Sequence, residues 1–243
     1  MAKKIINQGF STPRNGAKTA KIEIDVSTGN LVFSSLPAGD PQLASGTMQY
    51  LEGQEKPIMS VASGKGQTDL SLRAANLGPK WSLLPWKACM GATNWTVNIH
   101  PEVIADIRAH SGGGNLQLDL EGMTLQKVSA ETGGGNVDLS LPSDMDDFQV
   151  LAKSGGGNVK VKIGDRANGT SKVEVGSGAG NVTVTIPRNI AARIHAASGL
   201  GKVLIDSRFE KIGDKEYQSP DFEKAASKME ITVQSGAGNV EVS

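Results

Sequence analysis

Five-residue segments that begin with Ser or Thr, continue with glycine and end with Asn are the most chemically suggestive feature of this sequence. The clearest copies are Ser111 to Asn115, Thr132 to Asn136, Ser154 to Asn158 and Ser177 to Asn181. Glycine-rich loops can bind phosphate through backbone amides, but such loops precede a helix and usually carry a lysine. Here an alternating apolar segment, typical of a strand, follows each cluster. We therefore assign the clusters a structural role and expect no cofactor.

Carboxylates within these repeats suggest two further kinds of site. Asp138 gives its copy a superficial likeness to calcium-binding glycine–aspartate nonapeptides, but the required Gly-x-Asp and the nine-residue period are absent, so no metal is expected. Asp119 and Asp138 could also act as the carboxylate pair of a glycoside hydrolase, which needs a separation of about 5–9.5 Å. They occupy different positions in their repeats, where acids are usually solvated. We favour solvation for both.

Histidine and cysteine add little catalytic signal. The three histidines are His100, His110 and His195, and their spacing does not match that of metal ligands. The single cysteine, Cys89, excludes an internal disulfide framework and has no recognisable base nearby. The sequence thus predicts no catalytic residues and no enzyme.

An irregular segment around residues 73–96 holds the candidate partner-binding residues. Trp81, Leu84 and Trp86 lie close together there, and aromatic side chains in loops can anchor a protein partner. The alternative is that they cover an end of the core, because an open stack of strands exposes unpaired backbone groups. We retain these three residues as the candidate binding site.

The segments on either side of each glycine cluster predict two strands joined by a corner. Apolar and polar residues alternate after each Asn, which predicts a strand with one buried face. Apolar and polar residues also alternate before each Ser or Thr, with apolar residues four and two positions before it, and this predicts a second strand. Glycine suits a corner that needs a positive φ or a close approach of two backbones, and stacked Asn residues could form an amide-to-amide ladder. The apolar positions after Asn in the four clear copies are Leu116, Leu118 and Leu120; Val137, Leu139 and Leu141; Val159, Val161 and Ile163; and Val182, Val184 and Ile186.

The repeat length decides the fold class. Equivalent residues at 115, 136, 158, 181 and 202 are 21 to 23 residues apart, which is too short for a βαβ unit of about 30 residues. We predict an all-β stack of rungs, a β-solenoid or β-prism with glycine-rich corners, and the sequence is compatible with both a coiled solenoid and stacked hairpins. Weaker copies begin at Thr28, Ser63, Ser198 and Ser235.

Composition sets the domain organisation and excludes some partners. Lysine plus arginine and aspartate plus glutamate both total 25, so the chain has no net charge, and without a basic stripe we expect no nucleic-acid partner. Residues 1–20 read as a flexible tail and 21–243 as one domain. In that domain 21–99 is irregular, and 100–243 holds the regular repeats with a charged insertion at 207–228. No signal peptide or membrane-spanning segment is recognised, so a soluble, cytoplasmic protein is expected by default.

Several segments resemble the toast-rack domain of bacterial LiaF-like cell-wall-active antibiotic response proteins. The resemblance is carried by the NWTVNIHP segment with Asn94, Trp95 and Pro101, by the glycine rungs that follow, and by YQSPDF (217–222) with ITVQSGAGNVEVS. It covers about residues 21 to 243 and implies a right-handed, all-β stacked fold. It also implies contact with other proteins in envelope-stress signalling, and it brings no catalytic residues.

From these observations we predict a non-catalytic protein-interaction or scaffold module, linked to cell-envelope stress. Its partner would be a protein, such as a membrane sensor or an envelope component. Two alternatives stay open: a carbohydrate-binding or carbohydrate-active β-helix, and a self-assembling, adhesin-like structural protein.

Overall fold

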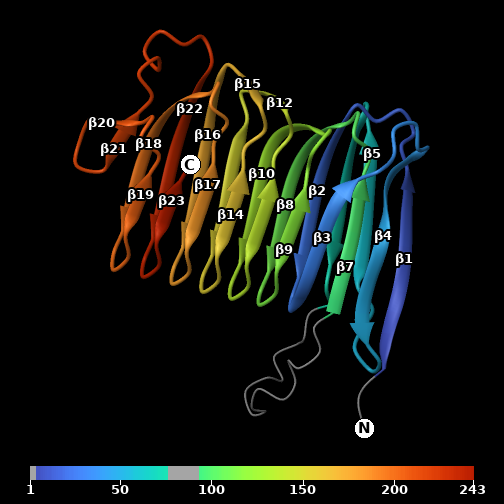
Figure 1. Ribbon diagram of the computed structural model, residues 1–243. Helices are drawn as coiled ribbons and strands as arrows, with labels where there is room; N and C mark the ends of the chain where they lie inside the picture. The colour runs from blue at the N-terminus through green and yellow to red at the C-terminus, as the bar shows by residue number, and fades with distance from the viewer. Residues whose placement is uncertain (1–3, 76–92) are drawn as a thin grey trace.

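The chain folds into two long β-sheets that lie face to face (Figure 1). The computed structural model describes residues 4–75 and 93–243, and every helix or strand assigned within them is a strand. In spatial order, the first sheet contains β1 (Ile5–Pro13), β4 (Gln42–Leu51), β7 (Thr93–Ile99), β3 (Gly29–Ser35), β9 (Leu116–Asp119), β11 (Val137–Ser140), β14 (Val159–Lys162), β17 (Val182–Thr185), β23 (Val240–Val242) and β19 (Val203–Ile205).

The second sheet is longer by one strand. In spatial order it contains β20 (Glu210–Lys211), β21 (Glu216–Gln218), β18 (Ala191–Ser198), β22 (Lys228–Ser235), β16 (Thr170–Ser177), β13 (Gln149–Ser154), β10 (Thr124–Thr132), β8 (Ile104–Ser111), β2 (Thr19–Val26), β6 (Gln67–Arg73) and β5 (Ile58–Gly64). A small third sheet joins β12 (Asp144–Asp146) to β15 (Arg166–Asn168).

Each predicted repeat is one coil of a solenoid, because its two strands lie in different sheets. β8 of the second sheet leads through the corner to β9 of the first, and β10–β11, β13–β14 and β16–β17 repeat this course. Neighbouring coils pair in parallel and in register, as Val137 with Val159 and Val150 with Val173 show. This arrangement confirms the all-β stacked fold and selects a solenoid over stacked hairpins.

The last coil does not lie last in the stack. β22 pairs with both β16 and β18, and β23 pairs with both β17 and β19, all in parallel. The C-terminal coil is therefore inserted between two coils that precede it in the sequence. The sequence spacing did not predict this order.

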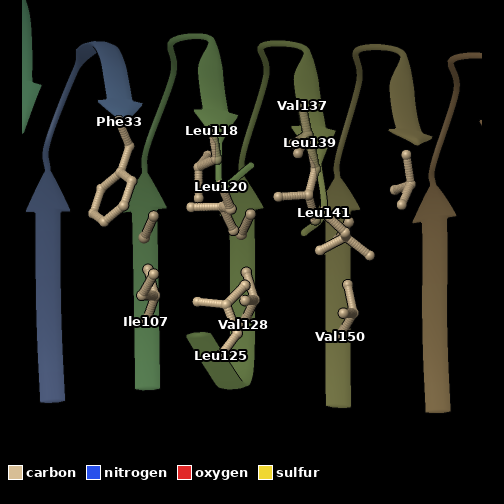
Figure 2. Close-up of a cluster of buried hydrophobic side chains, with 14 of the residues drawn as sticks. Phe33, Ile107, Leu118, Leu120, Leu125, Val128, Val137, Leu139, Leu141 and Val150 are labelled. Carbon is tan, nitrogen blue, oxygen red and sulfur yellow. The ribbon is translucent and has the colours of Figure 1, made fainter. Parts of the chain in front are cut away.

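The core fills the space between the sheets with the inward residues of every coil. Figure 2 shows Phe33, Leu118 and Leu139 from the first sheet facing Ile107 and Val150 from the second. Phe33 and Leu139 are fully buried, and Val150 nearly so. Burial of such a side chain stabilises the fold by about 1.5–3 kcal/mol before the cost of chain entropy. The alternation read from the sequence therefore positions the core correctly.

Two predicted boundaries need correction. Residues 5–13, expected within a flexible tail of residues 1–20, form β1, which pairs antiparallel with β4 along its length. Its inward residues, including Gln8 and Thr12, are mixed in polarity because β1 lies at the edge of the sheet, so the strand pattern is weak. The part predicted as irregular, 21–99, contains regular strands on both sides of residues 76–92: β2 to β6 before them and β7 after them. Two of the pairs there are antiparallel, β4 with β7 and β5 with β6.

Candidate functional site

The hydroxyl groups of the corners join successive coils. Ser154 Oγ donates a hydrogen bond to the carbonyl oxygen of Gly135 in the preceding coil, at 2.7 Å, and accepts one from the amide of Gly157, at 2.8 Å. Each hydroxyl thus satisfies two backbone groups that a sharp corner would leave unpaired. The same pair of bonds is made by Thr132, Ser177, Ser198 and Ser235.

The Asn side chains form a ladder, but with a different partner from the one predicted. The Oδ1 atom of Asn136 accepts a hydrogen bond from the backbone amide of Asn158, at 2.8 Å, and Asn158 Oδ1 accepts one from the amide of Asn181, at 2.9 Å. The ladder therefore runs from side chain to backbone and not from amide to amide. It ends where Asn239 Oδ1 accepts from the amide of Lys202, at 2.9 Å, because lysine has no side-chain acceptor.

Close contact between coils explains the glycines. A Cβ atom at Gly135 would overlap the carbonyl oxygen of Gly114, and one at Gly133 would overlap that of Gly112, whereas Gly134 faces open space. None of the three has a positive φ, so close approach, and not backbone conformation, is the reason for Gly133 and Gly135, and it does not apply to Gly134. The middle position accepts side chains, as Leu200 shows in the corner from Ser198 to Lys202, which is the last corner in the stack. The amides of Gly133, Gly135 and Asn136 bond within the stack and are therefore not available to bind a phosphate.

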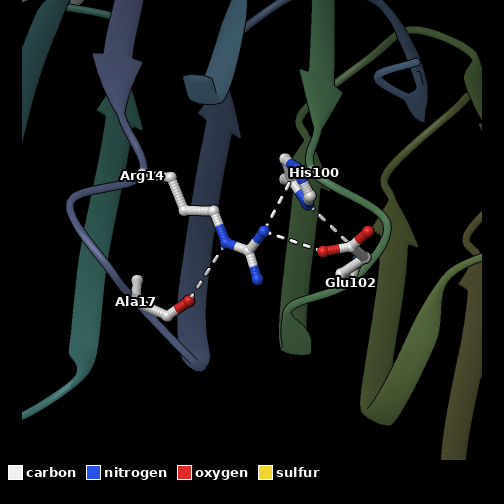
Figure 3. A network of polar contacts seen from close by, with 4 residues as sticks. All are labelled: Arg14, Ala17, His100 and Glu102. Atoms are coloured by element: carbon white, nitrogen blue, oxygen red, sulfur yellow. Dashed lines mark hydrogen bonds and ion pairs between the residues drawn. The ribbon is translucent and has the colours of Figure 1, made fainter. Parts of the chain in front are cut away.

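His100 is a buried structural residue. Its Nε2 lies 3.4 Å from Nη1 of Arg14, and its Nδ1 accepts a hydrogen bond from the amide of Glu102, at 3.2 Å. Arg14 also pairs with Glu102 at 2.8 Å and donates to the carbonyl oxygen of Ala17 (Figure 3). The network holds the segment after β1 against the start of the turn that leads to β8.

The other predicted candidates do not converge on one site. His110 lies on the exposed face of β8, and His195 of β18 contacts the Glu216 carboxylate at 2.6 Å. Asp138 is opposite Gln117 and Asp119 is opposite Ser140, so the two acids are diagonal neighbours, about 7–8 Å apart, on the exposed face of the first sheet. Among the described residues, no group of three or more His, Cys, Asp or Glu side chains is placed to hold a metal ion. Trp81, Leu84, Trp86 and Cys89 lie outside the described residues.

The open end beyond β18 and β19 carries three exposed apolar side chains. Leu200 is 86% exposed, Leu204 54% and Ile212 54%. They come from the last corner, from β19 and from the turn between β20 and β21, and we call Leu200, β19 and the β20–β21 hairpin the end surface. The sequence signal that could have found it is Lys202, which stands where the four clear copies have Asn.

Polar contacts fix the chain that builds the end surface. Arg208 donates to the carbonyl oxygens of Pro187, at 2.9 Å, and Ile186, at 2.6 Å, and its guanidinium lies 4.4 Å from the ring centre of Phe209. Burial lowers the pKa of Arg208, and the charge of Asp206 acts in the opposite direction. These contacts fasten the segment that crosses from β19 to β20.

A second set of contacts holds the hairpin and the chain after it. Arg193 of β18 donates to Gln218 of β21 at 2.8 Å, pairs with Glu223 at 2.7 Å, and lies over the ring of Phe222 at 4.5 Å. The end surface is therefore built on a firmly held hairpin.

The described residues include no exposed aromatic ring and no membrane-crossing helix. The aromatic residues among them are all buried or half-buried, whereas stacking on a sugar requires an exposed ring. No helix long and apolar enough to cross a membrane occurs in the described parts of the chain.

Two family models together match nearly the whole chain. The model described as the N-terminal domain of toast_rack matches residues 2–162, and the model described as the C-terminal part of the cell wall-active antibiotics response protein LiaF matches residues 144–242. No curated protein matches the sequence.

The comparison with solved structures supports the fold. A Clostridium sporogenes protein whose name refers to cell adhesion is 21% identical, with a TM-score of 0.69 over 98% of this chain and 99% of that one. A Bacteroides fragilis protein whose name refers to an adhesin is 12% identical, with a TM-score of 0.32 over 100% of this chain and 98% of that one. At these identities the first match supports the fold alone, and the second carries no argument.

Proposed function

Because this chain belongs to the toast-rack family of LiaF-like proteins, we propose that it is a non-catalytic protein-interaction module of the cell-envelope stress response. The observation that carries the proposal is the end surface: it combines the unpaired edge of β19 with exposed apolar side chains from the corner, from β19 and from the turn of a firmly held hairpin. An unpaired strand edge is a template for pairing with another chain. The family description, a response to cell wall-active antibiotics, supports the pathway.

The proposed mechanism is display of a rigid surface to a partner protein. The stacked coils bond to each other at every corner, which limits the conformational entropy that binding would cost. The partner class we propose is a membrane sensor or another envelope component. The hydroxyl and amide groups of the corners are used internally, so recognition depends on the end surface and on the exposed faces of the strands.

Site-specific photo-crosslinking in the source cells tests this proposal. A photo-reactive amino acid replaces Leu200 in one variant and Ala179 in a matched control, because both are exposed middle residues of their corners. We expect a specific protein crosslink at position 200 that changes when the cells are treated with a cell wall-active antibiotic. Identical products at both positions, or none with or without the antibiotic, would contradict an interaction role for this end.

A further inference from the structure

The two sheets end at different places on the C-terminal side of the stack. The first sheet ends at β19, but the second continues beyond β18 with β21 and β20. Since β18 and β19 belong to one coil, the hairpin extends the second sheet two strands further than the sheet that it faces (Figure 1). Tyr217 of β21 is opposite the buried residue Ile194, so its side chain lies on the inner face of the second sheet, toward the first sheet. A strand added beside β19 would lie over β21.

The free edge of β19 has unpaired backbone groups. The carbonyl oxygen of Lys202 accepts from the amide of Val240, at 2.9 Å, and the amide of Asp206 donates to Val242, at 2.8 Å. In a parallel ladder, alternate residues point to opposite neighbours. The amides and carbonyls of Val203 and Ile205 therefore point away from β23, and no described residue pairs with them.

The side chains of β19 are also less covered than those of the neighbouring strand. Val203 and Ile205 face inward but are only half-buried, whereas their partners Val240 and Val242 are almost completely buried. On the outer face, Lys202 and Asp206 flank the exposed Leu204, and neither forms an ion pair with another described residue. One oxygen of Asp206 accepts from the Arg208 amide, at 2.9 Å. The edge thus presents a positive charge, an apolar residue and a negative charge in sequence.

We propose that the edge of β19 binds one extended segment of a partner protein as an added antiparallel strand. Antiparallel pairs are slightly more stable than parallel ones, and strand addition to a free edge is a common mode of peptide recognition. In a register centred on Leu204, the segment would place a basic residue beside Asp206, an apolar residue beside Leu204 and an acidic residue beside Lys202. The proposal rests on the interaction role proposed above and names the chemistry of the partner.

A further coil of this chain's own type is a poorer occupant. Lys202 ends the Asn ladder, so the next corner would find no side-chain acceptor for its amide. A second copy paired through β19 would bring its own β20–β21 hairpin into the layer that this hairpin already fills. A lone strand avoids both problems.

Peptide titration of the full isotope-labelled chain, followed by NMR, tests the proposal. The probe Gly-Lys-Val-Leu-Ile-Asp-Ser repeats residues 201–207, whose charge order is the antiparallel complement of β19. The matched peptide replaces its Asp with Lys. We expect the first peptide to shift the amide signals of Val203 and Ile205, and to bind about two- to tenfold more tightly than the second, from the difference between an attractive and a repulsive cross-strand charge pair.

Two variants distinguish peptide pairing at the edge of β19 from non-specific peptide binding. Lys202→Glu should reverse the preference between the peptides. Val203→Pro should abolish binding without unfolding the chain, because the amide that it removes points to the open edge and not to β23. No shift of these amides at millimolar peptide, or a preference that Lys202→Glu does not reverse, would overturn the proposal.

Two further results distinguish this proposal from the proposed function. If Val203→Pro keeps the cellular crosslink made from position 200, the interaction role stands but β19 is not the docking edge. If sedimentation shows a dimer of the full chain that Val203→Pro abolishes, the occupant is a second copy, and the assignment to a different partner is wrong.

Discussion

The inner corner from Ser154 to Asn158 and the last corner from Ser198 to Lys202 begin with almost the same residues but have different surroundings. In the inner corner, Ser154 and Asn158 bond to the coils on both sides. In the last corner, Ser198 bonds inward in the same way, but Lys202 has no coil beyond it. The comparison shows that the Ser bonds are kept in both corners, whereas the Asn acceptor is present only where another coil follows.

Removing an apolar side chain should give the largest difference between the two regions. Leu139 is fully buried in an inner coil, so Leu139→Ala should lower the free energy of unfolding by about 2–5 kcal/mol. Leu204→Ala, at the exposed edge, should change it by about 0.5 kcal/mol or less. Urea unfolding followed by circular dichroism measures both values. A similar loss for the two variants would mean that β19 is covered and that the stack does not end there.

Adding a methyl group within one inner corner should lower stability less than Leu139→Ala does, but the loss should depend on which glycine is replaced. Gly135→Ala would force the new Cβ into the carbonyl oxygen of Gly114 and should cost about 1–3 kcal/mol. Gly134→Ala is the matched control, because its Cβ meets no atom within 4 Å and should change stability by about 0.5 kcal/mol or less. Thermal unfolding of the two variants compares them directly. Equal melting temperatures would refute close approach between coils as the reason for the glycine at position 135.

The sequence was sufficient to predict the inner coils because every level of the pattern agrees there. Alternation at Val137, Leu139 and Leu141, a corner motif before it and a repeat of 21 to 23 residues all predict the same stacked strands. The corner chemistry was only partly predictable. The sequence indicated that Asn136 belongs to a ladder, but its partner depends on the distance between coils, which no residue pattern encodes.

The sequence could not predict the order of the last coils. β22–β23 and β18–β19 carry nearly the same motif, so either could pair with β16 and β17, and local alternation does not distinguish them. The hairpin of β20 and β21 packs on β18, which leaves the inner place to the C-terminal coil. The predicted binding residues Trp81, Leu84 and Trp86 remain a prediction, and the end surface was missed because its apolar residues come from three separate segments.

The Asn ladder offers the finest comparison between an inner coil and the end. Asn158→Ala removes the acceptor of the Asn181 amide, and because this corner is exposed, water can replace part of the bond; we expect a loss of about 0.5–1.5 kcal/mol in the free energy of unfolding. Lys202→Ala removes a side chain that supports no further coil, so stability should stay within about 0.5 kcal/mol of the original protein. Amide hydrogen exchange adds a local readout, since Asn158→Ala should speed exchange at Asn181, whereas Lys202→Ala should leave the ladder amides unchanged. Slower exchange at Val203 after Lys202→Ala would instead indicate that removing the charge lets β19 pair, and would identify Lys202 as the residue that keeps this edge open.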